Sequence, residues 1–220
     1  FATPSDQVLL KLESPGGEVH GYGLCASQLW RLREKEIPFT VIVDKVAASG
    51  GYLMACIADR IIAAPFAIIG SIGVLMQLPN FNRLLKKNNV DFEMITAGEF
   101  KRTLTMFGEN SDKARKKAQE EVDETHQLFK SFVTTARESL DIDKVATGEF
   151  WYGKQAKELN LIDELGTSDD YLLSKSETMD IFEIERIAKP SLKERLTQAA
   201  EEGVIRVLKR ISHDNGPKLS

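Results

Sequence analysis

The chain has 220 residues and a formal net charge of −4, with 42% hydrophobic and 28% charged residues. This balance is typical of a globular protein with a core, and the length fits one domain of ordinary size with an extension. No broad cationic excess is available, which argues against a nucleic-acid partner. Cys25 and Cys56 are too few for a disulfide scaffold or a zinc site, and we expect both to be buried free thiols.

Neither a membrane span nor a signal peptide is evident in the sequence. The longest nearly apolar run, residues 61–70, is interrupted by Pro65 and is too short to cross a bilayer. The chain begins at Phe1, and a strand follows almost at once. This abrupt start is typical of a fragment, so we expect a targeting or anchoring segment upstream of Phe1.

Strands and helices alternate along most of the chain. Apolar and β-branched runs predict strands at residues 8–13, 39–43, 60–64 and 92–96. Helical spacing predicts helices at residues 19–35, 52–58 and 81–87, and a long helix that Ser111 caps and that runs to Leu140. A helix and a strand are expected to close the domain over residues 148–166, and residues 191–211 predict an amphipathic helix that packs on its own domain or on a neighbouring protomer.

This alternation indicates an α/β fold with parallel strand pairing and right-handed crossovers. We expect residues 1–166 to form one domain and residues 167–220 to form a helical C-terminal extension. Two turns, at residues 14–17 and 47–51, leave a strand and enter a helix. If their strands are neighbours, both turns lie at the sheet edge where α/β proteins usually carry their sites.

Ser49 lies in the second turn among small residues. Glycines let backbone N–H groups face a pocket, and a helix N-terminus adds donors without partners. The amide of Gly50, together with that of Gly16 or Gly17, therefore forms a candidate oxyanion hole beside the Ser49 hydroxyl. Taken alone, each turn also fits an ordinary N-cap or a tight turn.

A serine nucleophile needs a base, and two kinds of residue could supply it. Of the three histidines, His20 lies near the expected edge but at the start of a helix, whereas His126 and His213 lie elsewhere. The alternative is a lysine kept neutral by burial. Lys101 stands among apolar residues, although most lysines are solvated surface charges. The residues alone leave both alternatives open.

Five stretches in the same order resemble the signal peptide peptidase A family of serine proteases. They are residues 14–17 (SPGG), 46–52 (VAASGGY), 69–74 (IGSIGV), 97–101 (AGEFK) and 151–156 (WYGKQA). The resemblance covers about residues 8–165, and one departure is Glu13, where relatives often have Asn. It implies the Clp protease/crotonase-like fold of repeated strand–helix units.

The resemblance also implies a Ser–Lys dyad. Ser49 would be the nucleophile and Lys101 the general base, with Ser71 hydrogen-bonded to the lysine amine. The oxyanion hole would combine the Gly50 amide with that of Gly16, which is preferred to Gly17. No metal or organic cofactor is needed for this chemistry.

Substrates and partners follow from the resemblance as expectations. The substrates would be signal-peptide remnants or unfolded and membrane-derived polypeptides, and the protein would form a homo-oligomeric ring. An upstream N-terminal segment would anchor it in the bacterial inner membrane, with the catalytic domain in the periplasm. Two alternatives remain: a crotonase-like acyl-thioester enzyme, which pairs the same glycine amides without a serine nucleophile, and an inactive assembly subunit.

Overall fold

The computed structural model describes Thr3 and residues 5–185. Residues up to Thr178 belong to one compact unit and residues from Met179 onward to another. Every strand and helix named below lies in the first unit. The predicted helix at residues 191–211 lies outside the described residues.

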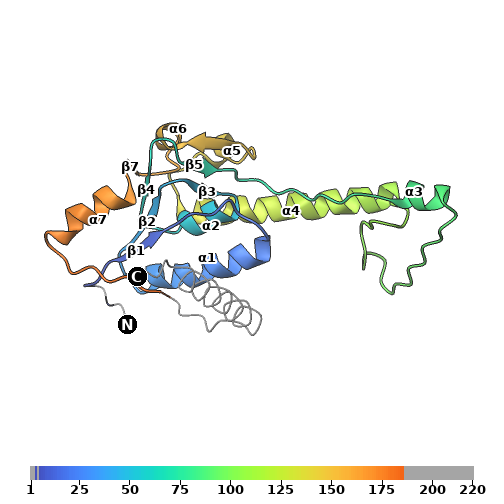
Figure 1. Cartoon of the computed structure of the whole chain (residues 1–220), viewed down its shortest axis with the longest axis horizontal. Coiled ribbons are helices and arrows are strands. Elements are labelled where there is room, and N and C mark those ends of the chain that lie inside the picture. The colour runs from blue at the N-terminus through green and yellow to red at the C-terminus, as the bar shows by residue number, and fades with distance from the viewer. Residues whose placement is uncertain (1–2, 4, 186–220) are drawn as a thin grey trace, which may run out of the picture. The chain divides into compact units, whose positions relative to one another are not determined.

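A four-stranded parallel sheet forms the centre of the first unit (Figure 1). Its order is β1 (Val8–Lys11), β2 (Phe39–Val43), β4 (Arg60–Ala63) and β7 (Glu164–Leu165). All five residues of β2 are buried, as expected for a central parallel strand covered on both faces. The predicted α/β class with parallel pairing is therefore confirmed.

A second, three-stranded sheet carries elements that the sequence did not reveal. It consists of β3 (Val46–Ala48), β5 (Ile68–Gly70) and β6 (Phe150–Tyr152), with β3 parallel and β6 antiparallel to β5. All three strands have only three residues, and two of the three residues in β3 are alanines, which strands usually avoid. Conversely, the strand predicted at residues 92–96 is wrong, because these exposed residues pair with no strand of the described chain.

The helices follow the predicted pattern, with shifted ends. The principal ones are α1 (Val19–Glu34), α2 (Gly50–Ala55) and α4 (Asp112–Ala136). The shorter ones are α3 (Asn82–Lys87), α5 (Ile142–Val145), α6 (Gly153–Glu158) and α7 (Ser168–Ser176).

The long helix α4 begins where the sequence predicts and ends earlier. Ser111 caps it, since its Oγ accepts a hydrogen bond from the Ala114 N–H at 3.2 Å. The helix ends before Arg137, which leaves helical geometry and pairs with Asp163 at 2.6 Å between Nη2 and Oδ1. Leu140, predicted inside the helix, is instead buried in the core from the loop that follows.

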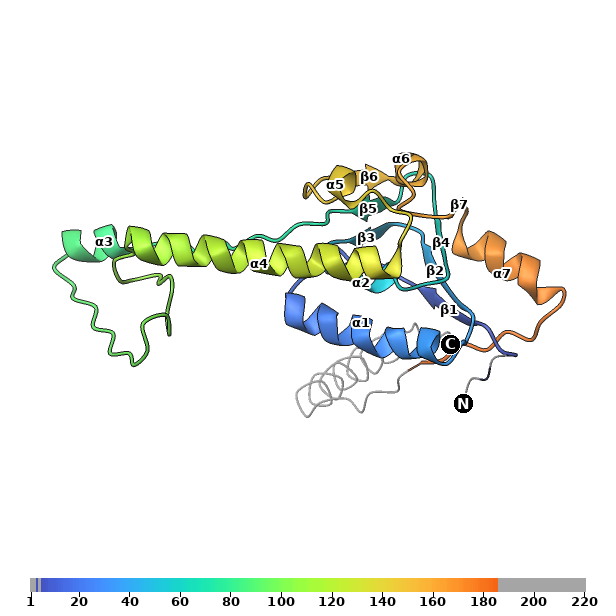
Figure 2. The same cartoon turned by 180° about the vertical axis from the view of Figure 1, so that it is seen from behind.

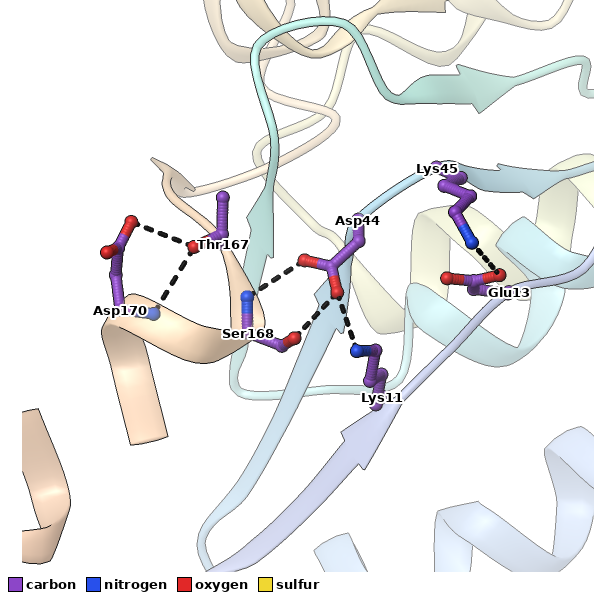
Figure 3. Close-up of polar contacts among 7 residues, drawn as sticks. All are labelled: Lys11, Glu13, Asp44, Lys45, Thr167, Ser168 and Asp170. Atoms are coloured by element: carbon purple, nitrogen blue, oxygen red, sulfur yellow. Dashed lines mark hydrogen bonds and ion pairs between the residues drawn. The ribbon is translucent and has the colours of Figure 1, made fainter. Parts of the chain in front are cut away.

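A polar cluster joins α7 to the sheet (Figure 3). The carboxylate of Asp44, which directly follows β2, accepts hydrogen bonds from the Ser168 N–H at 2.8 Å and the Ser168 hydroxyl at 2.6 Å. It also pairs with Lys11 of β1 at 3.0 Å. Thr167 caps α7 by accepting from the Asp170 N–H. The cluster thus ties two strands and a helix together.

The cysteines differ in their environments. Both are free, and Cys56 is buried, as predicted, whereas Cys25 is exposed on α1, which corrects the expectation that both are buried. Burial raises the pKa of the Cys56 thiol to about 12. Among the residues that the structure describes, no helix is long and apolar enough to span a membrane.

Candidate active site

The two glycine turns meet at one edge of the sheet. Ser14 forms a parallel bridge with Ala47, and the Ala48 N–H donates to the Ser14 carbonyl at 3.0 Å. A β-carbon on Gly16 would lie 2.7 Å from Ser49 Cβ and 2.8 Å from the Gly50 nitrogen. The prediction that neighbouring strands bring both turns to one edge of the sheet is therefore confirmed.

Ser49 connects β3 to α2 in a backbone conformation that is unusual for serine. Its φ of 52° lies in the left-handed region, which costs about 1–3 kcal/mol for a residue other than glycine. The Ser49 N–H donates to the Gly70 carbonyl at 2.7 Å, and the Ser49 side chain makes no capping hydrogen bond to α2. Ser49 is thus not an ordinary N-cap, because its hydroxyl does not bond to the helix that it precedes.

Ser71 repeats this conformation on the neighbouring strand. Ala48 pairs with Gly70 in the β3–β5 register, so Ser49 and Ser71 directly follow paired residues. Ser71 has a φ of 51°, and its N–H donates to the Glu149 carbonyl at 2.8 Å. The two serines therefore lie next to each other at the same edge.

Lys101 lies apart from these two serines within one chain. Its segment connects α3 to α4 and lies at the end of α4 that is remote from the sheet (Figures 1 and 2). An ion pair between Glu99 and Lys113 holds the segment against the first turn of α4. Going along α4 from its N-terminus, Phe129 is the first residue that belongs to the main core cluster. The distance along the helix axis from Lys113 to Phe129 is about 24 Å, so the first turn of α4 lies far from the core. Lys101 itself is exposed in the single chain, whereas a lysine that acts as a base is expected to be buried.

The glycine amides differ in their availability. The Gly16 N–H donates to the Ser14 Oγ at 3.3 Å. Gly50 is the first residue of α2, where an N–H group has no partner within the helix. The Gly17 N–H makes no hydrogen bond within the described part of the chain. Of these three amides in the described chain, only that of Gly16 therefore donates to a side chain.

Tyr22 of α1 is a residue that the sequence analysis missed. Its ring lies against Gly17 and Gly50, and its hydroxyl hydrogen-bonds with the Ser14 hydroxyl at 2.7 Å. The ring also forms one wall of a hollow of about 290 Å³, which Glu18, Gly21 and Cys25 complete. A tyrosine one helical turn beyond a glycine turn carries no sequence signal of such contacts.

Neither of the two histidines that the structure describes, His20 and His126, hydrogen-bonds to Ser49. His20 lies at the exposed surface, 3.2 Å from the Glu18 carboxylate. His126 lies within α4, and its Nε2 is buried without a hydrogen-bond partner. His213 lies outside the described residues. In the described part of the chain, no three His, Cys, Asp or Glu side chains cluster as metal ligands.

Comparisons with known proteins gave matches over nearly the whole chain. The profile described as "Peptidase family S49" matches residues 31–181, and "Peptidase family S49 N-terminal" matches residues 1–29. The chain is 56% identical to "Probable protease SohB" of Haemophilus influenzae, over 96% of this chain and 60% of the relative. For "Probable protease SohB" of Buchnera aphidicola subsp. Acyrthosiphon pisum, the identity is 56% over 96% of this chain and 62% of the relative.

A more distant relative also matches. The chain is 30% identical to "Putative signal peptide peptidase SppA" of Enterococcus faecium, over 75% of this chain and 48% of the relative. Across these three comparisons, this chain covers between 48% and 62% of the relative's length.

Proposed function

Because the chain belongs to peptidase family S49, we propose that it is a serine endopeptidase with a Ser–Lys dyad. In this proposal Ser49 is the nucleophile, Lys101 is the general base and Ser71 orients the lysine amine. The family membership confirms the resemblance drawn from the five sequence motifs. The parallel sheet and its strand–helix units are consistent with a Clp protease/crotonase-like fold, which is part of the proposal.

The observation that carries the proposal is the environment of Ser49. Its strained backbone places a serine that does not cap α2 beside the Gly50 amide and the glycine turn at residues 14–17. Strain of this kind persists at functional sites where the surroundings hold the backbone in place. A serine hydroxyl beside two amide donors is the arrangement that acyl transfer requires.

The chemistry is a two-step acyl transfer. The neutral Lys101 amine takes the Ser49 proton as Oγ attacks the peptide carbonyl carbon, and the oxygen becomes an oxyanion held by two amides. The ammonium then gives that proton to the leaving amine, and an ester to Ser49 remains. Water, deprotonated by the same amine, attacks the ester, and Ser49 recovers its proton as the acid leaves.

The oxyanion donors in this proposal are Gly50 and Gly17. Gly16, which the sequence analysis preferred, already donates to the Ser14 hydroxyl, so its N–H would have to change partner. Gly16 keeps a different role, because the absence of a β-carbon lets its turn pack directly against Ser49 and the Gly50 nitrogen.

We propose that the lysine reaching Ser49 comes from a second copy of the chain. Within one chain the Lys101 segment lies at the remote end of α4. Its neighbourhood exposes large apolar side chains, which favours burial against another surface. These are Leu84, Phe92, Met94, Ile95, Phe100 and Phe107. Burial there would also favour the neutral amine that a base requires.

We also propose the substrates, the assembly and the location of the protein. The substrates are signal-peptide remnants or unfolded and membrane-derived polypeptides, cut without a metal or organic cofactor. The assembly is a homo-oligomeric ring at the bacterial inner membrane, with its sites on the periplasmic side.

The proposal is tested with Ser49→Ala and Lys101→Ala, and with Ser27→Ala as a matched control on the exposed side of α1. Each of the first two variants should lower peptide turnover by at least about 10³-fold, and Ser27→Ala should not. A fluorophosphonate probe should label the wild type and Ser27→Ala, but not Ser49→Ala. Near wild-type turnover in either dyad variant contradicts the proposal, and an unlabelled wild type with acyl-thioester hydrolysis favours the crotonase-like alternative.

A further inference from the structure

Tyr22 contacts both of the turns that supply the proposed oxyanion donors. A β-carbon on Gly17 would lie 2.9 Å from Tyr22 Cε2, and one on Gly50 would lie 2.7 Å from Tyr22 Cδ2. Contacts this close mean that the ring rests directly on the two glycine backbones. The ring therefore spans the gap between the turn at residues 14–17 and the start of α2.

The hydroxyl of Tyr22 adds a polar connection to the first turn. It hydrogen-bonds with the Ser14 hydroxyl at 2.7 Å, and the Ser14 Oγ accepts the Gly16 N–H at 3.3 Å. Ser14 is buried, and its backbone is fixed to β3 through Val46 and Ala48. The chain of contacts thus runs from α1 through Ser14 to the peptide unit that joins Pro15 to Gly16, next to Gly17.

We propose that Tyr22 is a positioning residue that sets the distance and direction between the Gly17 and Gly50 amides. This inference rests on the proposed function and deepens it, because it names the residue that holds the oxyanion hole in shape. Donors stabilise an oxyanion only when they already point at the position where the charge develops. In this role Tyr22 acts through the two turns and takes no part in the proton transfers.

Tyrosine meets both requirements of this position. Its flat ring fills the space above two residues that lack side chains, and its rigid ring carries the hydroxyl to Ser14. Phenylalanine would keep the first contact and lose the second. Leucine would lose the hydroxyl and most of the ring contact, so the two turns would gain freedom to move relative to each other.

The kinetic test uses Tyr22→Phe and Tyr22→Leu in the full-length protein. Loss of one oxyanion donor lowers kcat by about 10²–10³-fold, so we expect about 10-fold for Tyr22→Phe and about 10²-fold for Tyr22→Leu. KM should stay within about twofold, because ground-state binding does not use the hole. The pH dependence of kcat should keep its wild-type midpoint, since the base is unchanged.

Tyr171→Phe is the matched control. It also removes a tyrosine hydroxyl that accepts a hydrogen bond, in this case from the Gln7 side chain at 2.9 Å, but it does so on α7. Its kcat should equal that of the wild type. A Tyr22→Leu variant with wild-type kcat, or one that raises KM as much as it lowers kcat, overturns the positioning role.

A second readout is independent of activity. Hydrogen exchange should become faster at residues 14–17 and 49–51 in Tyr22→Leu, while exchange in β2 stays as in the wild type. Equal acceleration throughout the first unit, or none at the two turns, overturns the inference. If the wild type cleaves no peptide and matches Ser49→Ala, the proposed function fails, and the exchange pattern alone then decides whether Tyr22 positions the turns.

Discussion

Ser49 and Ser71 share a left-handed backbone conformation, and hydrogen bonds hold each of them in it. The Ser49 N–H donates to Gly70 and the Ser71 N–H donates to Glu149, both at or below 2.8 Å. The strain of about 1–3 kcal/mol at each serine is therefore offset by the sheet around it. The positive φ of Ser49 and its missing capping hydrogen bond distinguish it from an ordinary N-cap serine. The neighbouring residues in the sequence do not show this distinction.

A substitution at Gly16 tests how closely its turn packs against Ser49. Gly16→Ala should destabilise the protein and abolish labelling of Ser49, since the position has a φ of 91° and the new methyl group would meet Ser49 and Gly50. Gly23→Ala is the control, because this helical position in α1 has open space around it. It should raise the free energy of unfolding by about 0.5–1 kcal/mol and keep activity. Denaturant unfolding and probe labelling measure both effects, and an active Gly16→Ala variant contradicts the close packing of the two turns.

At the scale of elements, α7 is fixed to the sheet through Asp44. Burial by itself would raise the pKa of this carboxyl. Hydrogen bonds from the Ser168 hydroxyl and N–H, together with the Lys11 ammonium, outweigh burial and hold the pKa below its usual value. A carboxylate with a lowered pKa stabilises the folded state above its unfolded pKa, and that stabilisation disappears as the pH falls through the folded pKa.

Asp44→Asn should therefore lower stability at pH 7 by about 1–3 kcal/mol, because the amide cannot accept all three donors. The difference from the wild type should remain constant above about pH 5 and shrink below about pH 4, as the wild-type carboxyl becomes protonated. Glu13→Gln is the control, since Glu13 pairs with Lys45 at the surface and exposed pairs contribute about 1 kcal/mol or less. Urea unfolding across this pH range measures the effect, and a pH-independent difference would show that Asp44 acts by other means.

Elements with strong periodicity could be predicted from the sequence. The helix at residues 19–35, the strand at residues 39–43 and the Ser111 cap agree with the structure within a residue or so. The strands β3 and β5 could not be predicted, because each has only three residues and becomes a strand through its pairing partner. Residues 92–96 have the opposite character: their apolar pattern suits a strand, but no neighbouring strand pairs with them.

The site itself divides in the same way. Ser49 and the glycine turns could be predicted, because glycine-rich turns between strands and helices gather at one edge of a parallel sheet. Ser71 was identified only through the family resemblance. Tyr22 could not be predicted, since its contacts depend on the angle at which α1 crosses the turns. The hydrogen bond from the Gly16 N–H to the Ser14 hydroxyl could not be predicted either, because it depends on a rotamer that the sequence does not specify.

At the scale of the whole molecule, the proposed Ser–Lys dyad requires more than one copy of the chain. The Glu99–Lys113 ion pair ties the Lys101 segment to the first turn of α4, whereas α2, which Ser49 precedes, packs in the core with the part of α4 from Phe129 onward. Exposed apolar side chains around the Lys101 segment, such as Ile95 and Phe100, make that end of the helix suitable for packing on another protomer. A closed ring of identical contacts would supply every Ser49 with a lysine from its neighbour.

Mixing two inactive variants tests this claim most directly. Ser49→Ala retains Lys101, and Lys101→Ala retains Ser49, so subunits are combined in equal amounts under conditions that allow exchange, and peptide turnover is measured. If the dyad forms between copies, about one site in four is complete, and the mixture should recover about a quarter of wild-type turnover. If light scattering and native mass spectrometry show mixed assemblies, yet turnover remains at the level of the separate variants, Lys101 of a neighbouring copy is not the base for Ser49.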